Sequence, residues 1–450
     1  MGRLFGTDGI RGVANQYPIT AELAVKLGRT VASIFKDGSS RPKILIGKDT
    51  RLSGDMLEHA LASGICSGGA DAYLVGVLPT PGVAQLISSE DINAGIMISA
   101  SHNPFHDNGI KIFHKNGFKL SDEKENEIEA LLLEKEKDSF SDNPISDIGR
   151  IYKYNDASEC YMTFLKNLLE ETAPFKNIKI AMDCSNGATY DVAPRLFSDL
   201  GACVHTISID PNGSNINDDC GSEHPGKLLE KVLETGADVG LAFDGDGDRL
   251  IAVDEQGDVI RGNQILLICA NYMKKRGILK NNLVVSTVMS NVGFGIALET
   301  LGINHLTTDV GDRYVLEKMI QTGAVLGGED SGHLIFLDHH TTGDGLLSAL
   351  RLISALKAES KKLSELGCLM TVFPQVLMNV EVDKKPDIGT VPEVMRAIGR
   401  VESELGKKGR VLVRYSGTQP LCRVMVEGPE MEKTKEYCQY LSDVIKDSIG

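Results

Sequence analysis

Two short polar strings in this chain contain residues that could do chemistry. The first, Ser99-Ala100-Ser101-His102-Asn103-Pro104, follows the apolar run 94–98. That run predicts a buried parallel strand, so the hydroxyl of Ser101 should stand in the turn at the strand's carboxyl end. Ligands bind at this end of the strands in open α/β sheets. Ser101 is therefore our candidate nucleophile.

The second string is Asp244-Gly245-Asp246-Gly247-Asp248-Arg249. Its carboxylates occupy every other position, so an extended backbone aims all three the same way, and the glycines let the chain curl around an ion. A calcium loop of the EF-hand type is not favoured, because Arg249 stands where that loop requires Gly. Aspartyl-phosphate chemistry is not favoured either, because Asp248 stands where a haloacid-dehalogenase motif needs Thr or Val. Hard carboxylate oxygens predict one Mg²⁺ or similar ion, held by Asp244, Asp246 and Asp248.

The composition restricts the partners and the location. The 450 residues carry 47 Lys plus Arg against 62 Asp plus Glu, a formal net charge of −15. This balance argues against nucleic acid and against an acidic membrane surface as partners. Nine dispersed cysteines without a C-x-x-C pair indicate reduced core residues. With no apolar leader and no run near the roughly 18 apolar residues of a membrane span, we expect a cytoplasmic protein.

One order of elements repeats three times along the chain, which is informative about the whole fold. A strand, a helix-like stretch, a second strand opening with Gly and a third strand ending in a polar loop follow one another. The first strands are expected at 42–49, 177–183 and 282–287, and the second strands open at Gly69, Gly201 and Gly302. The third strands end in Ser99–Pro104, Asp244–Arg249 and Gly327–His333. Each repeat thus delivers its most polar loop at the equivalent strand end, so the three loops can converge on one site.

From about Phe373 the pattern changes to strand, helix, strand, strand and helix. We therefore predict an α/β protein with three similar mixed α/β domains around a central cleft, followed by a C-terminal α+β domain. The expected domains are 1–155, 156–256, 257–372 and 373–450. In the last of them, the turn 414–420 offers a guanidinium, hydroxyls and backbone amides, which are donors suited to phosphate.

Three further side chains have both a structural and a chemical interpretation. Arg11 lies between two glycines and is either a surface turn residue or part of an anion site. Lys111 is either solvated or carried past Ser101 by an antiparallel strand. His333 is either a core imidazole or a site residue. The residues alone leave these alternatives open.

Taken together, five motifs resemble those of the α-D-phosphohexomutase superfamily, in its order and at its spacing across the whole chain. They are Phe5–Gly12, Ser99–Pro104, Asp244–Arg249, Gly328–His333 and Arg414–Pro420. Within the superfamily, the first motif and the segments 310–315 and 341–345 are similar to the bacterial phosphoglucosamine mutase branch. The resemblance implies an isomerase that interconverts glucosamine 6-phosphate and glucosamine 1-phosphate, a step toward UDP-N-acetylglucosamine and the cell wall. Phosphomannomutase or phosphoglucomutase activity is the alternative within the class, and a sugar-phosphate binding protein that does not turn over is the alternative outside it.

The resemblance also implies roles for individual residues. Ser101 would be the phosphorylated serine, and its phosphate would share one Mg²⁺ per chain with Asp244, Asp246 and Asp248. Arg11, Lys111 and Arg249 would surround the transferring group, with His333 as the candidate for proton transfer. Glu329 and Ser331 would bind sugar hydroxyls. The phosphate that does not react would be held by Arg414, Ser416, Gly417 and Thr418. A hexose 1,6-bisphosphate would act as activator and intermediate, and the chain would form a homodimer.

Two positions depart from the family pattern. Gln419 stands in the phosphate turn where Glu is usual, which would reduce repulsion of the phosphate. Asp330 stands in the sugar loop where these mutases usually have Gln. We hypothesise that the Asp330 carboxylate favours a protonated amine at C2 of the sugar.

Overall fold

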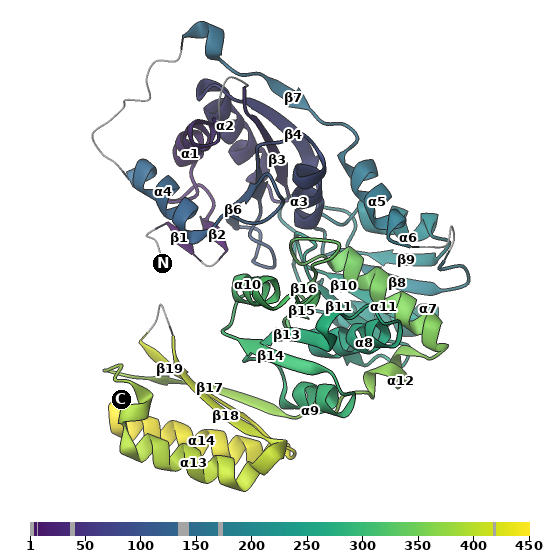
Figure 1. The fold of residues 1–450 in the computed structure, drawn as a ribbon, viewed down its shortest axis with the longest axis vertical. Coiled ribbons are helices and arrows are strands. Elements are labelled where there is room, and N and C mark those ends of the chain that lie inside the picture. The colour runs from purple at the N-terminus through teal and green to yellow at the C-terminus, as the bar shows by residue number, and fades with distance from the viewer. Residues whose placement is uncertain (1–3, 7, 37–40, 134–143, 170–173, 417–419) are drawn as a thin grey trace. The chain divides into compact units, whose positions relative to one another are not determined.

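The computed structural model describes residues 4–6, 8–36, 41–133, 144–169, 174–416 and 420–450, which Figure 1 shows as a ribbon. The first sheet has seven strands in the order β1-β2-β6-β5-β3-β4-β7. They are β1 (Phe5–Gly6), β2 (Gly9–Val13), β3 (Lys43–Lys48), β4 (Asp71–Val77), β5 (Ala94–Ile98), β6 (Asp107–His114) and β7 (Ile151–Lys153). The helices of this part are α1 (Ala21–Ile34), α2 (Gly54–Ser67), α3 (Thr80–Ser89) and α4 (Asp122–Leu133).

The second sheet has the order β12-β11-β10-β8-β9, and the third has the order β14-β13-β15-β16. The second contains β8 (Lys179–Asp183), β9 (Cys203–Ile207), β10 (Val239–Phe243), β11 (Leu250–Asp254) and β12 (Val259–Ile260), with α5 (Ala157–Asn167), α6 (Val192–Asp199) and α7 (Gly226–Thr235). The third contains β13 (Leu283–Thr287), β14 (Asn304–Thr308), β15 (Leu326–Gly328) and β16 (Leu334–Phe336). Its helices are α8 (Gly262–Lys275), α9 (Val292–Thr300), α10 (Asp312–Thr322), α11 (Gly345–Glu359) and α12 (Leu363–Gly367).

The strand order confirms the threefold repeat. In each repeat the third strand lies parallel to the first and antiparallel to a fourth: β5 with β3 and β6, β10 with β8 and β11, and β15 with β13 and β16. The second strand takes the far side of the first in all three sheets. The polar strings therefore follow β5, β10 and β15 at equivalent places.

The third strands are apolar because they are covered on both faces, as strands in parallel sheets are. Every residue of β5 and of β10 is buried. Gly95 in β5 is required by close packing, since a Cβ there would come within 1.9 Å of the Ile87 side chain on α3. These strands give the turns that follow them a rigid base.

The C-terminal sheet is antiparallel, in the order β17-β19-β18. Its elements are β17 (Gln375–Glu381), α13 (Pro392–Leu405), β18 (Arg410–Tyr415), β19 (Leu421–Glu427) and α14 (Met431–Ile449). Buried residues of the sheet and of both helices, such as Val380, Val401 and Leu441, form one core. The predicted order of strand, helix, strand, strand and helix is confirmed, and with it the α+β character of this part.

Contacts divide the chain into two compact units. The first consists of Met1–Val288 and Leu306–Gly367, and the second of Met289–His305 and Cys368–Gly450. Helix α9 belongs to the second unit, where the carboxylate of Glu427 accepts hydrogen bonds from the Asn291 amide and from the N–H of Val292, each over 3.1 Å. The domain boundaries expected from the sequence stay predictions.

Candidate active site

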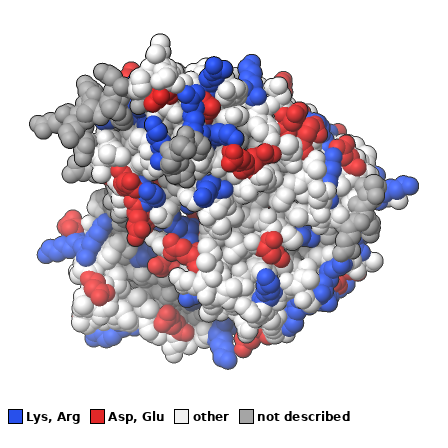
Figure 2. All heavy atoms as spheres, turned by 45° about the horizontal axis from the view of Figure 1, so that its top comes forward, with Lys and Arg blue, Asp and Glu red and all other residues white. Residues whose placement is uncertain are grey.

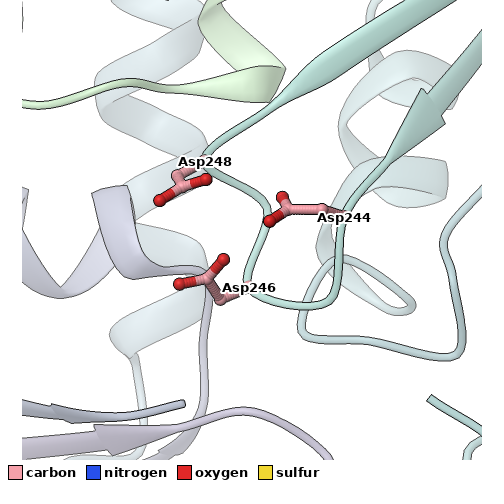
Figure 3. Close-up of side chains that lie close together, drawn as sticks. All are labelled: Asp244, Asp246 and Asp248. Atoms are coloured by element: carbon pink, nitrogen blue, oxygen red, sulfur yellow. The ribbon is translucent and has the colours of Figure 1, made fainter. Parts of the chain in front are cut away.

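Three carboxylates gather in the turn between β10 and β11. Asp244, Asp246 and Asp248 each offer an oxygen within 4.8 Å of the others, and Figure 3 shows the three side chains converging. Gly247, with a φ of 73°, lets the chain bend between the last two. Asp246 Oδ1 and Asp248 Oδ1 are buried and have no hydrogen-bond partner among the described residues. Because such atoms are costly to bury, they mark the place of a cation.

The electrostatics of the turn fit the same interpretation. Burial, together with the charges of Asp248 and Asp246, raises the pKa of Asp244 well above its ordinary value. Burial acts on Asp246 too, but the Lys111 ammonium and the hydrogen bond from Thr80 together outweigh it, so the pKa of Asp246 lies below the ordinary value. A divalent ion would remove the repulsion among these groups. A donor set made only of carboxylate oxygens fits Mg²⁺.

Ser101 stands in the turn after β5, as the sequence predicts, and is 1% exposed. Its Oγ donates to Asp244 Oδ2 over 2.5 Å, and its backbone N–H donates to Ser99 Oγ over 2.9 Å. The neighbouring His102 has its Nδ1 3.5 Å from Ser101 Oγ. The hydroxyl therefore lies against a carboxylate of the cation site.

Lys111 is buried beside this group rather than solvated. Its Nζ lies 2.9 Å from Asp246 Oδ2, 3.1 Å from Asp8 Oδ2 and 3.7 Å from Asp248 Oδ2. Strand pairing explains the position, because Lys111 on β6 opposes Met97 on β5. Of the two interpretations that the sequence left open, the antiparallel return past the serine is the one that the structure has.

Two arginines border the same group. Arg11 on β2 pairs with Asp8 and donates from Nη1 to the carbonyl of Ala100 over 3.3 Å. Arg249 follows the carboxylates, with its Nη1 3.3 Å from Glu223 Oε1 and its Nε 3.9 Å from Asp248 Oδ1. Together with Lys111 they place positive charge around the hydroxyl of Ser101, which suits a group that carries negative charge.

The loop after β15 joins the site through an isolated β-bridge between Arg249 and His333. His333 is 4% exposed, with Nε2 3.7 Å from Asp312 Oδ2 and 3.9 Å from Asp248 Oδ2. Neither ring nitrogen of His333, nor the Oγ of Ser331, has a hydrogen-bond partner among the described residues. Glu329 accepts from the N–H of Gly311 over 3.2 Å, and burial raises its pKa. The ring nitrogens of His333 and the hydroxyl of Ser331 are therefore buried polar groups that a ligand could satisfy, rather than satisfied core groups.

Some residues of the site were not predicted from the sequence. Lys119 Nζ bridges Asp8 Oδ1 over 2.5 Å and Asp312 Oδ2 over 2.6 Å. The hydroxyl of Thr80 donates to Asp246 Oδ2 over 2.6 Å. Asp8 and Asp312 fall inside the segments 5–12 and 310–315, whose family resemblance is a signal that could have found them. Lys119 and Thr80 have no such signal around them.

Comparison of the chain with known proteins identifies its family. Four domain descriptions of the phosphoglucomutase/phosphomannomutase family match: alpha/beta/alpha domains I, II and III at residues 2–139, 159–257 and 261–373, and the C-terminal domain at 377–444. Relatives named phosphoglucosamine mutase are 58% identical in Syntrophus aciditrophicus and 56% identical in Syntrophobacter fumaroxidans, each covering 100% of both chains. The chain belongs to the phosphoglucosamine mutase family. Membership makes it an isomerase that transfers a phosphoryl group within a sugar phosphate.

Solved structures share the fold. A phosphoglucomutase/phosphomannomutase family protein from Burkholderia thailandensis has a TM-score of 0.81 at 24% identity, covering 99% of this chain and 97% of that chain. An N-acetylphosphoglucosamine mutase from Aspergillus fumigatus, in complex with GlcNAc-6P and magnesium, has a TM-score of 0.69 at 16% identity, covering 99% and 96%. Identities this low speak for the fold alone. They agree with three α/β domains and a C-terminal domain.

Of the remaining predicted residues, Arg414 and Ser416 belong to the second unit. Arg414 opposes Arg423 across β18 and β19, and burial together with the Arg423 charge lowers the pKa of Arg414. Ser416 accepts at its carbonyl from Lys385 Nζ over 2.8 Å. Gly417, Thr418 and Gln419 lie outside the described residues.

Asp330 has a structural contact that the sequence did not suggest. Its Oδ1 accepts from the N–H of Asn263 over 3.1 Å, and its carbonyl accepts from the N–H of Gly262 over 3.2 Å. Both donors lie in the first turn of α8, where N–H groups lack partners inside the helix. The Asp330 carboxylate therefore caps a helix.

Proposed function

We propose that this protein interconverts glucosamine 6-phosphate and glucosamine 1-phosphate through a phosphoserine at residue 101 and a 1,6-bisphosphate intermediate. The observation that carries the proposal is the contact of Ser101 Oγ with Asp244 Oδ2 over 2.5 Å, inside a buried group of carboxylates, lysine and arginine. A binding protein has no need of a hydroxyl against a cation site. Full-length identity of 58% and 56% to relatives named phosphoglucosamine mutase supports the choice of sugar.

The proposed reaction balances without a further reactant. The O1 hydroxyl of glucosamine 6-phosphate attacks the phosphorus of phosphoserine 101, the new O1–P bond forms as the Oγ–P bond breaks, and the hydroxyl proton passes to a base while Oγ regains a proton. The bisphosphate then reorients, so that its 6-phosphate faces Ser101. Ser101 Oγ then gives up its proton and attacks the phosphorus at position 6. The Oγ–P bond forms as the O6–P bond breaks, O6 takes up a proton, and glucosamine 1-phosphate leaves with the phosphoserine restored. A trace of hexose 1,6-bisphosphate phosphorylates Ser101 by the same second step.

The site's own charges suit this transfer. A phosphoryl group in transit spreads negative charge over its oxygens, so fixed cations lower the barrier more than covalent assistance does. Lys111, Arg11 and Arg249 are the proposed cations, and each is held by a carboxylate neighbour. Mg²⁺ on Asp244, Asp246 and Asp248 would supply further neutralisation of the phosphoryl oxygens when bound.

Proton transfer and sugar binding are proposed for the third repeat. His333 is the candidate base, because its ring nitrogens have no partner among the described residues. Glu329 and Ser331 are the proposed partners of sugar hydroxyls. Arg414, Ser416, Gly417 and Thr418 are proposed to hold the phosphate that does not react. Ser101 is 1% exposed, and exclusion of water at this place would protect a phosphoserine from hydrolysis.

The proposed partner is a small phosphosugar rather than a polymer. Basic and acidic side chains are interspersed on the face that Figure 2 shows, over a formal net charge of −15. Within the described part of the chain, no helix is long and apolar enough to cross a membrane. The homodimer and the cytoplasmic location stay predictions.

The test is ³¹P NMR of the purified protein with Mg²⁺ and a trace of hexose 1,6-bisphosphate. Glucosamine, glucose and mannose 6-phosphates are offered separately, with Ser101→Ala as control. We expect the 1-phosphate resonance to grow fastest from glucosamine 6-phosphate and to be absent with the variant. Fastest conversion of glucose or mannose phosphate would move the activity to phosphoglucomutase or phosphomannomutase. Absence of any conversion would support the alternative that the protein binds sugar phosphates without converting them.

A further inference from the structure

The turn that carries Ser101 is held by two side chains that share the same pair of acceptors. Nη2 of Arg51 donates to the carbonyl of Ser101 over 2.9 Å and to that of Asn103 over 2.8 Å. Nδ2 of Asn217 donates to the same two carbonyls, over 2.9 Å and 3.0 Å. Arg51 follows β3 in the first repeat, whereas Asn217 follows β9 in the second. The turn is thus fixed from two repeats at once.

We call the side chains of Arg51 and Asn217 the clamp, and Arg51 is its more buried member. It is 3% exposed, and its Nε donates to Asp49 Oδ2 over 2.9 Å. The same carboxylate oxygen accepts from Ser99 Oγ over 2.5 Å, and Ser99 Oγ accepts from the N–H of Ser101. The guanidinium reaches four carbonyls of the turn, those of Ser101, Asn103, Pro104 and Asp107. A single charge-assisted network therefore holds both ends of the string.

Asn217 forms the other side and brings the second repeat to the turn. Its backbone has a φ of 58°, and its N–H donates to the carbonyl of Ser185 over 2.9 Å. The backbone of the carboxylate string packs on the same spot, because a Cβ on Gly245 would lie 2.5 Å from the Ser101 carbonyl oxygen and 2.8 Å from Asn217 Nδ2. The Asn217 amide, the Ser101 carbonyl and the backbone of the carboxylate string are therefore packed closely together.

The backbone conformation of Ser101 explains why the turn needs to be held. Ser101 has a φ of 53°, in the left-handed region that residues with a Cβ adopt at a cost. That conformation turns the hydroxyl toward Asp244 while the carbonyl faces Arg51 and Asn217. The two donors on this carbonyl stabilise the left-handed conformation and so offset part of its cost.

We propose that Asn217 and Arg51 are positioning residues for phosphoryl transfer: they fix Ser101 in its left-handed conformation and so hold the phosphoserine in line with the cation site. This inference rests on the proposed mutase function. Neither residue needs to touch the sugar, so substrate binding is independent of them. Loss of the clamp therefore acts on turnover, not on affinity.

The test compares Asn217→Gly with Asn281→Gly. Asn281 is a matched control, because it also has a left-handed backbone, with a φ of 57°, and its Nδ2 donates to a carbonyl, that of Thr322, over 2.9 Å. Glycine adopts this conformation without strain, so each variant removes the side-chain amide without straining the backbone. We expect kcat of Asn217→Gly to fall about 10- to 100-fold, since small misplacements of reacting groups have effects of this size, with KM as in the control.

A second readout does not depend on activity. Hydrogen exchange of a peptide covering 99–107 should be faster in Asn217→Gly than in wild type and unchanged in Asn281→Gly. Arg51→Lys keeps the charge beside Asp49 but loses the several N–H donors of the guanidinium. It should therefore also lower kcat and speed up hydrogen exchange of this peptide. Equal kcat and equal exchange in Asn217→Gly and Asn281→Gly would overturn the inference. If wild type converts no sugar phosphate, the proposed function fails, and exchange alone decides whether Asn217 holds the turn.

Discussion

Thr80 and Asp246 are joined twice: the Thr80 hydroxyl donates to Asp246 Oδ2 over 2.6 Å, and the Thr80 N–H donates to the Asp246 carbonyl over 2.9 Å. Thr80 is fully buried at the first position of α3, in the first repeat, whereas Asp246 belongs to the second. Lys111 shares the same carboxylate oxygen. Oδ2 is thereby occupied, and Oδ1 is left to face the cation.

Removing the hydroxyl of Thr80 should weaken metal binding. Partners of a ligating carboxylate fix its orientation, and their loss typically lowers metal affinity by about ten-fold or more. We expect Thr80→Val, which keeps the side-chain shape, to show this loss and Thr80→Ser to retain most of the affinity. Titration with Mn²⁺ followed by electron paramagnetic resonance measures it without substrate. Equal affinity in the two variants would show that the hydroxyl does not orient Asp246.

Lys119 should matter for stability as well as for activity. Burial would lower its pKa, but the carboxylates of Asp312 and Asp8 raise it, so the ammonium stays charged between them. Lys119→Met removes this cation from Asp312 and from Asp8, which keeps Arg11 and Lys111, so we expect a loss on the order of 1–3 kcal/mol. The control is Lys124→Met, whose exposed pair with Glu127 is worth less than about 1 kcal/mol. Thermal melting compares them, and equal melting temperatures would contradict the expectation.

The pH dependence of stability should contain a contribution from Asp344. Burial raises its pKa to about 7, although the N–H of Leu347 and the hydroxyl of Tyr161 favour the charged form. In the unfolded chain the pKa is about 3.9. Because the folded pKa is the higher one, the stabilisation is fully present below about pH 4 and is lost as the pH rises to about 7.

The variant Asp344→Asn cannot titrate and should lack this loss. Its melting temperature relative to wild type should therefore rise between about pH 4 and pH 7 and stay level above about pH 7. Asp443→Asn on the exposed side of α14 serves as control. Parallel pH curves for wild type and Asp344→Asn would show that Asp344 has an ordinary pKa in the folded protein.

Asp330 should prove to be a helix cap and not a determinant of the sugar. Asp330→Ala removes the acceptor for the Asn263 N–H and should cost about 1 kcal/mol, whereas Asp330→Asn keeps an acceptor and should cost less. Neither should change the ratio of kcat/KM for glucosamine and glucose phosphates. A lower ratio in Asp330→Asn would instead support the hypothesis that its charge attracts the amine.

Those parts of the molecule that depend on local pattern could be predicted from the sequence. The apolar runs of β5 and β10 and the strings after them are contiguous, so the strand ends, the repeat and the carboxylate cluster follow from the residues alone. Thr80, Lys119 and Asn217 could not be found in this way, because each acts on a different repeat and stands in a stretch typical of any helix start or loop. Their partners in the site lie far along the chain, 111 positions away for Lys119 and Asp8 and 193 for Lys119 and Asp312.

The two interpretations of Lys111 show the same limit. Spacing allowed a return past Ser101, but only the pairing of β5 with β6 decides that the side chain lies on the buried face. The assignment of α9 to the second unit is a further case. At the start of α9, Asn291 and Val292 donate to Glu427, a residue more than a hundred positions further along the chain, and no local pattern predicts that contact.

The shared strand order of the three sheets bears on how the protein regains activity after denaturation. Hydroxyl, carboxylates and imidazole each sit on a different sheet, so a single sheet that has folded contains no working part of the site. Domains generally fold as units before they dock. Recovery of enzymatic turnover should therefore lag behind recovery of the circular dichroism signal. The delay would measure the time that the folded repeats need to dock.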